Sequence, residues 1–312
     1  MSATWIDTLL TGPVAAEPCT SVAQWWPRHR ALAATQRRSI DVAILGGAAA
    51  DRVAWAFGSA FQAALRTLVA GLEDDRLAAL CITETQGNAP RDLRTTLRRD
   101  GDHVVLDGAK HWATLGPNGA LFLVAARDVE ASIDARPALR LVRVPAGMPG
   151  LHIDTMPPTA FVPEIPHARL RFENLRLPAS AVVPGDAYVL HVKPFRTIED
   201  LHVHAAVLAY LVRESRRLRW PRAWTERAIA NLLAFDGIAG LDPTASTTHV
   251  ALAGALADGD RLAQEADGHW ASSDDREPAA RWQRDRALLG IASKPRAMRA
   301  QRAWERLVMP NA

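Results

Sequence analysis

Residues 82–114 read ITETQGNAPRDLRTTLRRDGDHVVLDGAKHWAT, and the fold of the whole chain is best predicted from this stretch. It contains a Thr-Glu pair at 83–84, a Gly-Asn step at 87–88 and the segment GAKHWAT at 108–114. This stretch therefore combines short hydroxyl side chains, glycines and one large aromatic residue. It is also rich in strand-forming residues. We expect paired strands whose ends present these groups.

Strand patterns continue beyond this opening. The apolar residues 104–106 precede Asp107-Gly108, a dipeptide that favours a tight hairpin turn. Residues 121–125 (LFLVA) form an apolar run typical of a buried strand, and apolar residues alternate with arginines over 168–172. The middle third of the chain is therefore predicted to be β-rich.

Helical periodicity flanks this β-rich part on both sides. Apolar residues recur every three or four positions over 51–72, and again from Phe195 until Trp220-Pro221 ends the pattern. Further helices are predicted near the C-terminus, with a loop within 258–275 and a break at Pro295: 222–235, 248–266 and 277–307. Helices, then strands, then helices predict an α+β fold and disfavour a doubly wound nucleotide-binding sheet.

Composition narrows the class of protein. The 312 residues include 37 Lys and Arg against 34 Asp and Glu, so the net charge is only +3 and nucleic acid is not the expected partner. Cys19 and Cys81 are far apart and predict neither a disulfide framework nor a metal site. No apolar run reaches the roughly 20 residues of a membrane helix, so we expect a cytoplasmic protein without membrane contact. The C-terminal arginines, Arg296 and Arg299 among them, are interpreted as a solvated helix face.

The order and spacing of the motifs resemble the middle domain of acyl-CoA dehydrogenases. In that family Thr-Glu-Pro, Gly-Ser-Asp and Gly-x-Lys-x-Trp-Ile-Thr form one wall of a flavin pocket, and ARLRFENLRLP at 168–178 is similar to a strand that closes the same barrel. The resemblance covers about 81–185. It implies an acyl-CoA dehydrogenase-like fold with three parts: an N-terminal helical domain over 1–80, a middle β-barrel domain over 81–187 and a C-terminal helical bundle over 188–312.

The resemblance also implies a flavin site between barrel and bundle. A flavin ring has polar edges and two apolar faces, so hydroxyl groups, backbone donors and an aromatic wall suit it. The residues that correspond to the family's FAD-binding positions are of these types: Ile82, Thr83, Gly87, Asn88, Trp112 and Thr114. By carry-over, Ile82 and Thr83 would meet the pyrimidine side of the ring, Trp112 would flank it, and Thr114 would bond near N5.

Several positions depart from the family pattern. Thr85 stands where the family has Pro, and Asn88-Ala89 stands where it has Ser-Asp. Trp220-Pro221 occupies the region where family members carry an Arg-x-x-Phe-Gly stretch that holds the adenine half of FAD. Contacts to the acyl-CoA and to adenine are therefore less well supported than contacts to the flavin ring.

Glu199 is the candidate catalytic base. Dehydrogenation of an acyl thioester needs a carboxylate that removes the α proton while hydride leaves the β carbon. The isovaleryl-type and long-chain branches of the family place this glutamate early in the first helix of the C-terminal domain, and Glu199 lies in register with it. The same residues also fit a simple helix start, with Thr197 as N-cap and acidic residues in the first turn.

The resemblance therefore implies an FAD-dependent oxidoreductase that acts on an acyl-CoA or a related thioester. It also implies a homodimer or homotetramer and leaves room for an electron-transfer protein as acceptor. Two alternatives stay open: a degenerate, non-catalytic homologue that acts in assembly or ligand binding, and a flavin oxidase or monooxygenase on the same fold.

Overall fold

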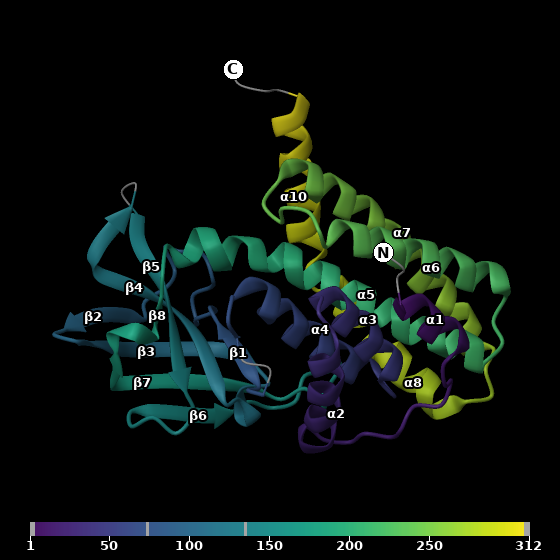
Figure 1. Ribbon diagram of the computed structural model, residues 1–312, viewed down its shortest axis with the longest axis horizontal. Coiled ribbons are helices and arrows are strands. Elements are labelled where there is room, and N and C mark those ends of the chain that lie inside the picture. Colours follow the sequence, from purple (N-terminus) through teal and green to yellow (C-terminus); the bar gives the residue numbers. More distant parts are fainter. Residues whose placement is uncertain (1–3, 73–74, 134–135, 309–312) are drawn as a thin grey trace. The chain divides into compact units, whose positions relative to one another are not determined.

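The computed structural model describes residues 4–72, 75–133 and 136–308 (Figure 1). The chain divides into a helical unit and a sheet unit. The helical unit comprises Met1–Thr67, Thr159–Glu164 and Arg196–Ala312, and the sheet unit comprises Leu68–Pro158 and Ile165–Phe195.

The sheet unit contains one eight-stranded sheet, counted over the described residues. Its strands are β1 (Ala78–Cys81), β2 (Thr96–Asp100), β3 (His103–Thr114), β4 (Leu121–Ile133), β5 (Arg136–Pro145), β6 (Leu151–Thr155), β7 (His167–Pro178) and β8 (Val182–Val183). The spatial order is β6-β7-β3-β2-β4-β5-β8, and β1 pairs in parallel with β4. The β-rich middle that the sequence predicts is confirmed.

The hairpin predicted at Asp107-Gly108 is wrong. The chain reverses between β2 and β3, where Gly101 has a φ of 60°, and β3 continues without a turn from His103 to Thr114. Gly108 lies instead at a β-bulge opposite β7, with a φ of 136°. A Cβ at Gly108 would lie 2.6 Å from the Cα of Thr95, so only glycine lets the two strands approach this closely.

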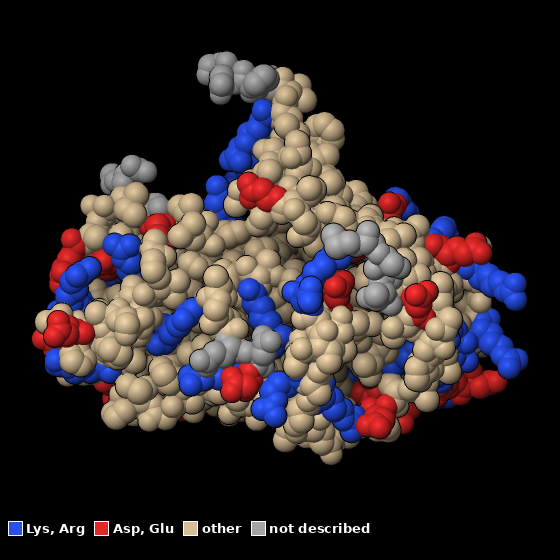
Figure 2. Space-filling model, viewed as in Figure 1, with Lys and Arg blue, Asp and Glu red and all other residues tan. Residues whose placement is uncertain are grey.

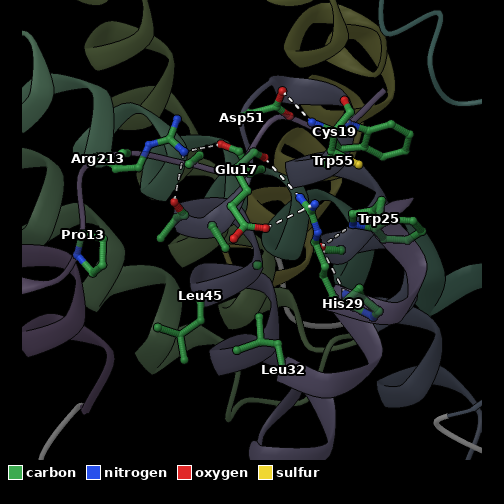
Figure 3. Close-up of a pocket in the computed structure, with 18 of the residues that line it drawn as sticks. Pro13, Glu17, Cys19, Trp25, His29, Leu32, Leu45, Asp51, Trp55 and Arg213 are labelled. Atoms are coloured by element: carbon green, nitrogen blue, oxygen red, sulfur yellow. Dashed lines mark hydrogen bonds and ion pairs between the residues drawn. The ribbon is translucent and has the colours of Figure 1, made fainter. Parts of the chain in front are cut away.

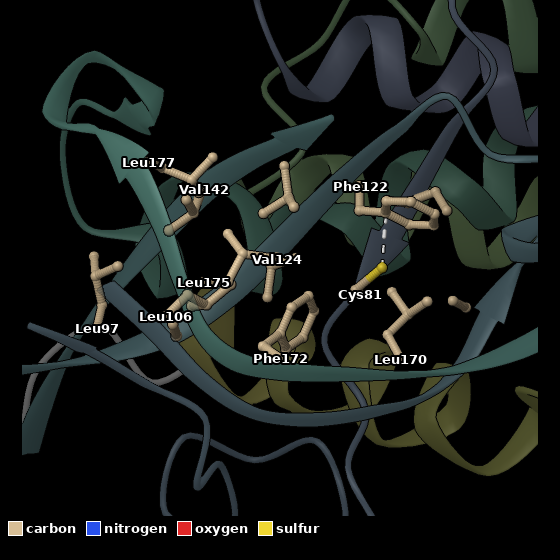
Figure 4. Close-up of a cluster of buried hydrophobic side chains, with 14 of the residues drawn as sticks. Cys81, Leu97, Leu106, Phe122, Val124, Val142, Leu170, Phe172, Leu175 and Leu177 are labelled. Atoms are coloured by element: carbon tan, nitrogen blue, oxygen red, sulfur yellow. Dashed lines mark hydrogen bonds between the residues drawn. The ribbon is translucent and has the colours of Figure 1, made fainter. Parts of the chain in front are cut away.

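The alternation predicted for 168–172 is confirmed in β7, where Ala168, Leu170 and Phe172 are buried and the arginines between them are exposed. The phase of the alternation then changes at Asn174, whose φ is 49°, because β7 carries the extra residue of the bulge there. These side chains join residues of the other strands in a single buried cluster (Figure 4): Cys81, Leu97, Leu106, Phe122, Val124 and Val142.

The helical unit combines helices from both ends of the chain. The N-terminal ones are α1 (Thr4–Thr11), α2 (Val22–Thr35), α3 (Ser39–Ala49) and α4 (Val53–Leu68). The C-terminal ones are α5 (Lys193–Arg217), α6 (Arg222–Ile238), α7 (Ser246–Ala271), α8 (Arg276–Asp285), α9 (Ala287–Gly290) and α10 (Ser293–Val308). The helices predicted from apolar periodicity are confirmed.

Two local predictions near the C-terminus need correction. The loop expected within 258–275 is mostly helix, because buried residues continue the apolar stripe of α7 as far as Trp270. The break expected at Pro295 lies earlier, around Gly290–Ala292, and Pro295 occupies the first turn of α10, where proline is tolerated.

The C-terminal arginines are not all on a solvated face. Arg296 Nε and Arg299 Nη2 lie 3.0 and 2.9 Å from the carboxylate of Asp200, which is only 3% exposed on α5. Exposed cations of α10, such as Arg302 and Arg306, do point to solvent, and Figure 2 shows Lys and Arg side chains along this helix. Arg296 and Arg299 therefore hold α10 against α5, whereas the exposed arginines keep the other face of α10 in contact with solvent.

The segment Thr159–Glu164 belongs to the helical unit although it lies between β6 and β7 in the sequence. The Glu164 carboxylate pairs with Arg52 and Arg284, each at 3.1 Å. The backbone N–H of Val162 donates to Asp285, whose side chain is fully buried. This segment therefore connects N-terminal and C-terminal helices to each other. The three-domain division at residues 80 and 187 stays a prediction.

Candidate functional site

A buried ion pair holds the end of β1 to β3. Lys110 Nζ lies 2.7 Å from Glu84 Oε1 and donates to the carbonyl of Ile82 at 3.2 Å. Lys110 is fully buried and Glu84 is 8% exposed. The other interactions of the Glu84 carboxylate come from the backbone N–H groups of Arg94 and Thr95. Three segments of backbone, at Ile82–Glu84, at Arg94–Thr95 and at Lys110, are thereby fixed around one charged pair.

The proton affinities of this pair follow from its surroundings. Burial opposes ionisation of Glu84, but the Lys110 ammonium and the two backbone donors hold its pKa below the ordinary value. Burial lowers the pKa of Lys110, and the Glu84 carboxylate opposes that shift. Both groups are thus held as a charged, hydrogen-bonded pair.

Several predicted flavin-binding residues lie beside this pair. Ile82 and Thr83 are half-buried, and the carbonyl of Thr83 accepts the backbone N–H of His111 at 2.8 Å. Thr114, also half-buried, ends β3 and is paired with His167 on β7. Ile82 and Thr83 therefore lie against β3, and Thr114 lies at the end of the same strand, against β7.

Trp112 combines an exposed side chain with an uncommon backbone conformation. Its ring is 50% exposed, and its φ of 60° is uncommon for a bulky residue. The strain arises at a second bulge in β3, between Lys110 and Ala113. The indole meets the ring of His167 edge-on, with centroids 5.6 Å apart. An exposed aromatic plate held in a strained conformation is typical of a ligand-binding position.

Gly87 and Asn88 lie in a tight turn next to Glu84. The backbones of Glu84 and Gly87 exchange hydrogen bonds of 2.8 and 3.1 Å, and Gly87 has a φ of 134°. A Cβ there would lie 2.9 Å from Asp92 Oδ2. Asn88 is exposed. The turn presents backbone and a small amide to solvent, and the predicted contact of Gly87 and Asn88 with a cofactor stays a prediction.

Glu199 lies on α5 in the helical unit, whereas the six cofactor candidates lie in the sheet unit. Its side chain is 20% exposed, and Arg196 approaches it at 3.7 Å. Burial raises the pKa of Glu199 to about 7, and the neighbouring Asp200 adds to the shift against the opposing effects of Arg196 and Arg296. A carboxyl with this pKa is matched to proton abstraction near neutral pH.

The interpretation of Thr197 as a helix N-cap is wrong. A π-helical turn over Tyr188–Val192 leads directly into α5, which begins at Lys193, so Thr197 lies in the second turn and is buried. Glu199 is therefore not at the positive end of the helix, and the helix dipole does not account for its presence. Desolvation dominates its chemistry instead.

Three residues beside the predicted site were not proposed from the sequence. Glu84 and Lys110 form the buried pair, and His167, whose pKa is lowered by burial, contacts Trp112. The first two stand inside the Thr-Glu and Gly-x-Lys-x-Trp motifs, so their pairing could have been inferred from two buried-strand positions of opposite charge. His167 carries no local signal, because only strand pairing brings it to Trp112.

Comparison with known proteins finds a family model that matches part of the chain. The model "Acyl-CoA dehydrogenase, middle domain" matches residues 79–175. The 3-sulfinopropanoyl-CoA desulfinase of Advenella mimigardefordensis is 30% identical over 107 residues, which are 34% of this chain and only 27% of that protein. The sequence match therefore spans about a quarter of this curated relative.

Solved structures share the fold over most of the chain. Butyryl-CoA dehydrogenase from Megasphaera elsdenii superposes with a TM-score of 0.68 at 13% identity, over 89% of this chain and 85% of that one. Glutaryl-CoA dehydrogenase from Mycobacterium smegmatis gives 0.61 at 17% identity, over 98% and 95%. The acyl-CoA dehydrogenase-like fold expected from the sequence is confirmed, and residues 79–175 match the middle domain of the acyl-CoA dehydrogenases.

None of the helices within 4–72, 75–133 and 136–308 is both long and apolar enough to cross a bilayer.

Proposed function

We propose that this chain is an FAD-dependent oxidoreductase that removes the α and β hydrogens of an acyl thioester, with CoA as the carrier. The observation that carries the proposal is the exposed, strained Trp112 beside the half-buried Thr83 and Thr114. An aromatic plate next to hydroxyl and backbone groups fits a ring that has apolar faces and polar edges. CoA is supported by the names of the relatives, a desulfinase and two dehydrogenases of CoA thioesters.

Each residue has a defined task in this proposal. Trp112 would hold the flavin ring through an apolar contact, and Thr83 and Thr114 would offer hydrogen bonds to its polar atoms. The Glu84–Lys110 pair holds the backbone of Ile82 and the strand that carries Trp112 in fixed register. When bound, the flavin supplies a hydride acceptor.

Glu199 removes the α proton in this proposal. Its carboxyl is ionised above a pH of about 7 and its low exposure limits competition from water. Arg196, 3.7 Å from the carboxylate, favours the ionised form that accepts the proton. The proton then stays on the carboxyl of Glu199 until the product leaves.

The first test is the visible absorption spectrum of the purified chain before and after addition of FAD. A bound flavin spectrum supports the proposal, and Trp112→Ala should weaken FAD binding about tenfold through loss of one ring contact. A colourless protein that does not bind FAD would instead establish the non-catalytic alternative.

The second test addresses the base. Anaerobic addition of an acyl-CoA should bleach the flavin of the wild-type protein, and Glu199→Gln should slow bleaching by at least about a hundredfold. Arg222→Gln, an exposed change at the start of α6, serves as the control variant and should bleach at the wild-type rate. Oxygen consumption without an added acceptor would identify an oxidase rather than a dehydrogenase.

A further inference from the structure

A cavity of about 380 Å³ lies entirely within the helical unit (Figure 3). This volume falls in the range of small-molecule pockets, roughly 300–1,000 Å³. Residues of α1 to α4 and of α5 line it, and none of the residues proposed for flavin or for proton transfer does: Leu9, Pro13, Trp25, His29, Leu32, Leu45, Ala48, Trp55, Ser59, Arg213 and Arg216 are among the lining residues.

The walls of the cavity are mainly apolar and carry two indoles. Trp25 and Trp55 stack with centroids 5.6 Å apart. Trp25 Nε1 donates to Ser59 Oγ at 3.2 Å, and Trp55 Nε1 donates to the carbonyl of Cys19 at 2.8 Å. Because both indole N–H groups are already paired, the rings offer the cavity hydrocarbon surface rather than donors.

His29 adds a neutral group to the same wall. Ser59 Oγ accepts from Trp25 Nε1 and also lies 3.1 Å from His29 Nδ1, within hydrogen-bond distance. The other ring nitrogen, His29 Nε2, has no partner among the described residues. Burial lowers the pKa of His29 to about 3, so the ring stays uncharged at working pH.

Arg213 and Arg216 of α5 also line the cavity. Figure 3 shows Arg213 across the cavity from Trp25 and His29. Arg213 is 3% exposed, binds the carbonyl of Ala50 at 2.5 Å and pairs with Glu214, and its Nε has no partner among the residues that the structure describes. Arg216 donates only to the carbonyls of Leu9 and Gly12 and has no carboxylate partner within the described part of the chain.

The carboxylates of the lining do not balance these cations. Glu17 pairs with Arg28 at 3.2 Å, and Asp51 pairs with Arg52 at 2.8 Å. Within the described part of the chain, Arg216 therefore has only backbone carbonyls as partners. The Nε–H of Arg213 has no acceptor among the described residues. A cavity with hydrocarbon walls and, among the described residues, one guanidinium without a carboxylate partner and one unpaired Nε–H of a second arginine matches an amphipathic anion.

We propose that this cavity binds a small carboxylate with an apolar or aromatic body. The body would pack on Trp25, Leu32 and Leu45, and the carboxylate would face Arg213 and Arg216. Recognition of this kind needs no flavin and no Glu199, so it is independent of the function proposed above.

The test uses the full chain, with phenylacetate as the probe and phenylacetamide as a neutral analogue of the same size. Titration is followed by calorimetry and by fluorescence of the tryptophans. We expect saturable binding of phenylacetate and binding of the amide at least about tenfold weaker, because a charge-assisted hydrogen bond is lost. Arg216→Met should weaken phenylacetate about tenfold, and Arg216→Lys should restore part of the loss.

The location is tested by filling the cavity. Ala48→Phe should abolish binding, whereas Ala251→Phe, the same change on the exposed face of α7, should leave it unchanged. Leu45→Trp fills the same space from the preceding turn and replaces Ala48→Phe if that variant does not fold, as judged by its melting temperature. Equal affinity for acid and amide, binding that survives the filling variant, or no saturable binding of phenylacetate would each overturn the proposal.

Discussion

The carboxyl of Glu199 holds its proton more tightly than an exposed glutamate does, because burial and Asp200 raise its pKa to about 7. The unfolded chain, with an ordinary pKa near 4.5, binds this proton less tightly. Glu199 therefore favours folding fully only below about pH 4.5, and that contribution is lost as the pH rises through 7.

The direction of this pKa shift predicts how the substitution of Glu199 changes stability with pH. Glu199→Gln should gain stability relative to the wild type as the pH rises from about 4.5 to 7, by roughly 2–3 kcal/mol in total, and then stay level. Urea unfolding of both proteins between pH 5 and 8 measures the difference in the free energy of unfolding. A pH-independent difference would show that the carboxyl has an ordinary pKa, and it would remove the main support for Glu199 as base.

Lys110 gives a second prediction at the residue scale. Lys110→Met leaves the Glu84 carboxylate buried without its cation, which costs about 3–5 kcal/mol. The double variant Lys110→Met with Glu84→Gln removes both charges and should recover a large part of that loss. Urea unfolding of the single and double variants gives the coupling between the two residues.

The same variants separate positioning from stability. Lys110 also donates to the carbonyl of Ile82, a bond that the double variant does not restore. We expect FAD affinity to remain low in the double variant even where the free energy of unfolding recovers. Recovery of both together would mean that the pair acts on folding alone.

At the scale of the elements, the two bulges between β3 and β7 set the form of the site. Gly108→Ala should destabilise the chain by about 3 kcal/mol or more, since its φ of 136° and the close backbone of Thr95 both exclude a Cβ. Gly101→Ala is the matched control. Its φ is 60°, but a Cβ would have nothing within 4 Å, so the cost should stay near 1 kcal/mol. Thermal unfolding of the two variants compares their losses of stability. Equal losses would show that the close approach of Thr95 is not the reason why a glycine is needed at position 108.

The elements also show what can be predicted from sequence. Period and composition are local properties, so α4, α5 and the strand from Ala168 to Phe172 follow from the residues themselves. Asp107-Gly108 suits both a hairpin and a bulge, and only the pairing of β3 with β7 decides between them. Glu84 with Lys110, and Trp112 with His167, depend on such pairing too, which a single sequence does not display.

At the scale of the helical unit, single carboxylates connect segments that are distant in sequence. Glu164 receives Arg52 from before α4 and Arg284 from α8, and it is 13% exposed. Burial opposes its ionisation, but hydrogen bonds from its own backbone N–H and from the two arginines lower its pKa. Its contribution to stability is therefore present above pH 4.5 and is lost as the pH falls through the depressed pKa.

Glu164→Gln should accordingly lower the free energy of unfolding by about 2–3 kcal/mol at pH 7, because two partly buried guanidinium groups lose their shared carboxylate. At a pH below the depressed pKa the difference should largely disappear, since the wild-type carboxyl is then protonated as well. Glu265→Gln is the control: that side chain is 41% exposed and pairs with Arg227 between α6 and α7, and its loss should cost less than about 1 kcal/mol. If urea unfolding gave equal losses for the two variants, Glu164 would be an ordinary surface charge, and the stability of the helical unit would come from apolar packing between its helices rather than from the segment Thr159–Glu164.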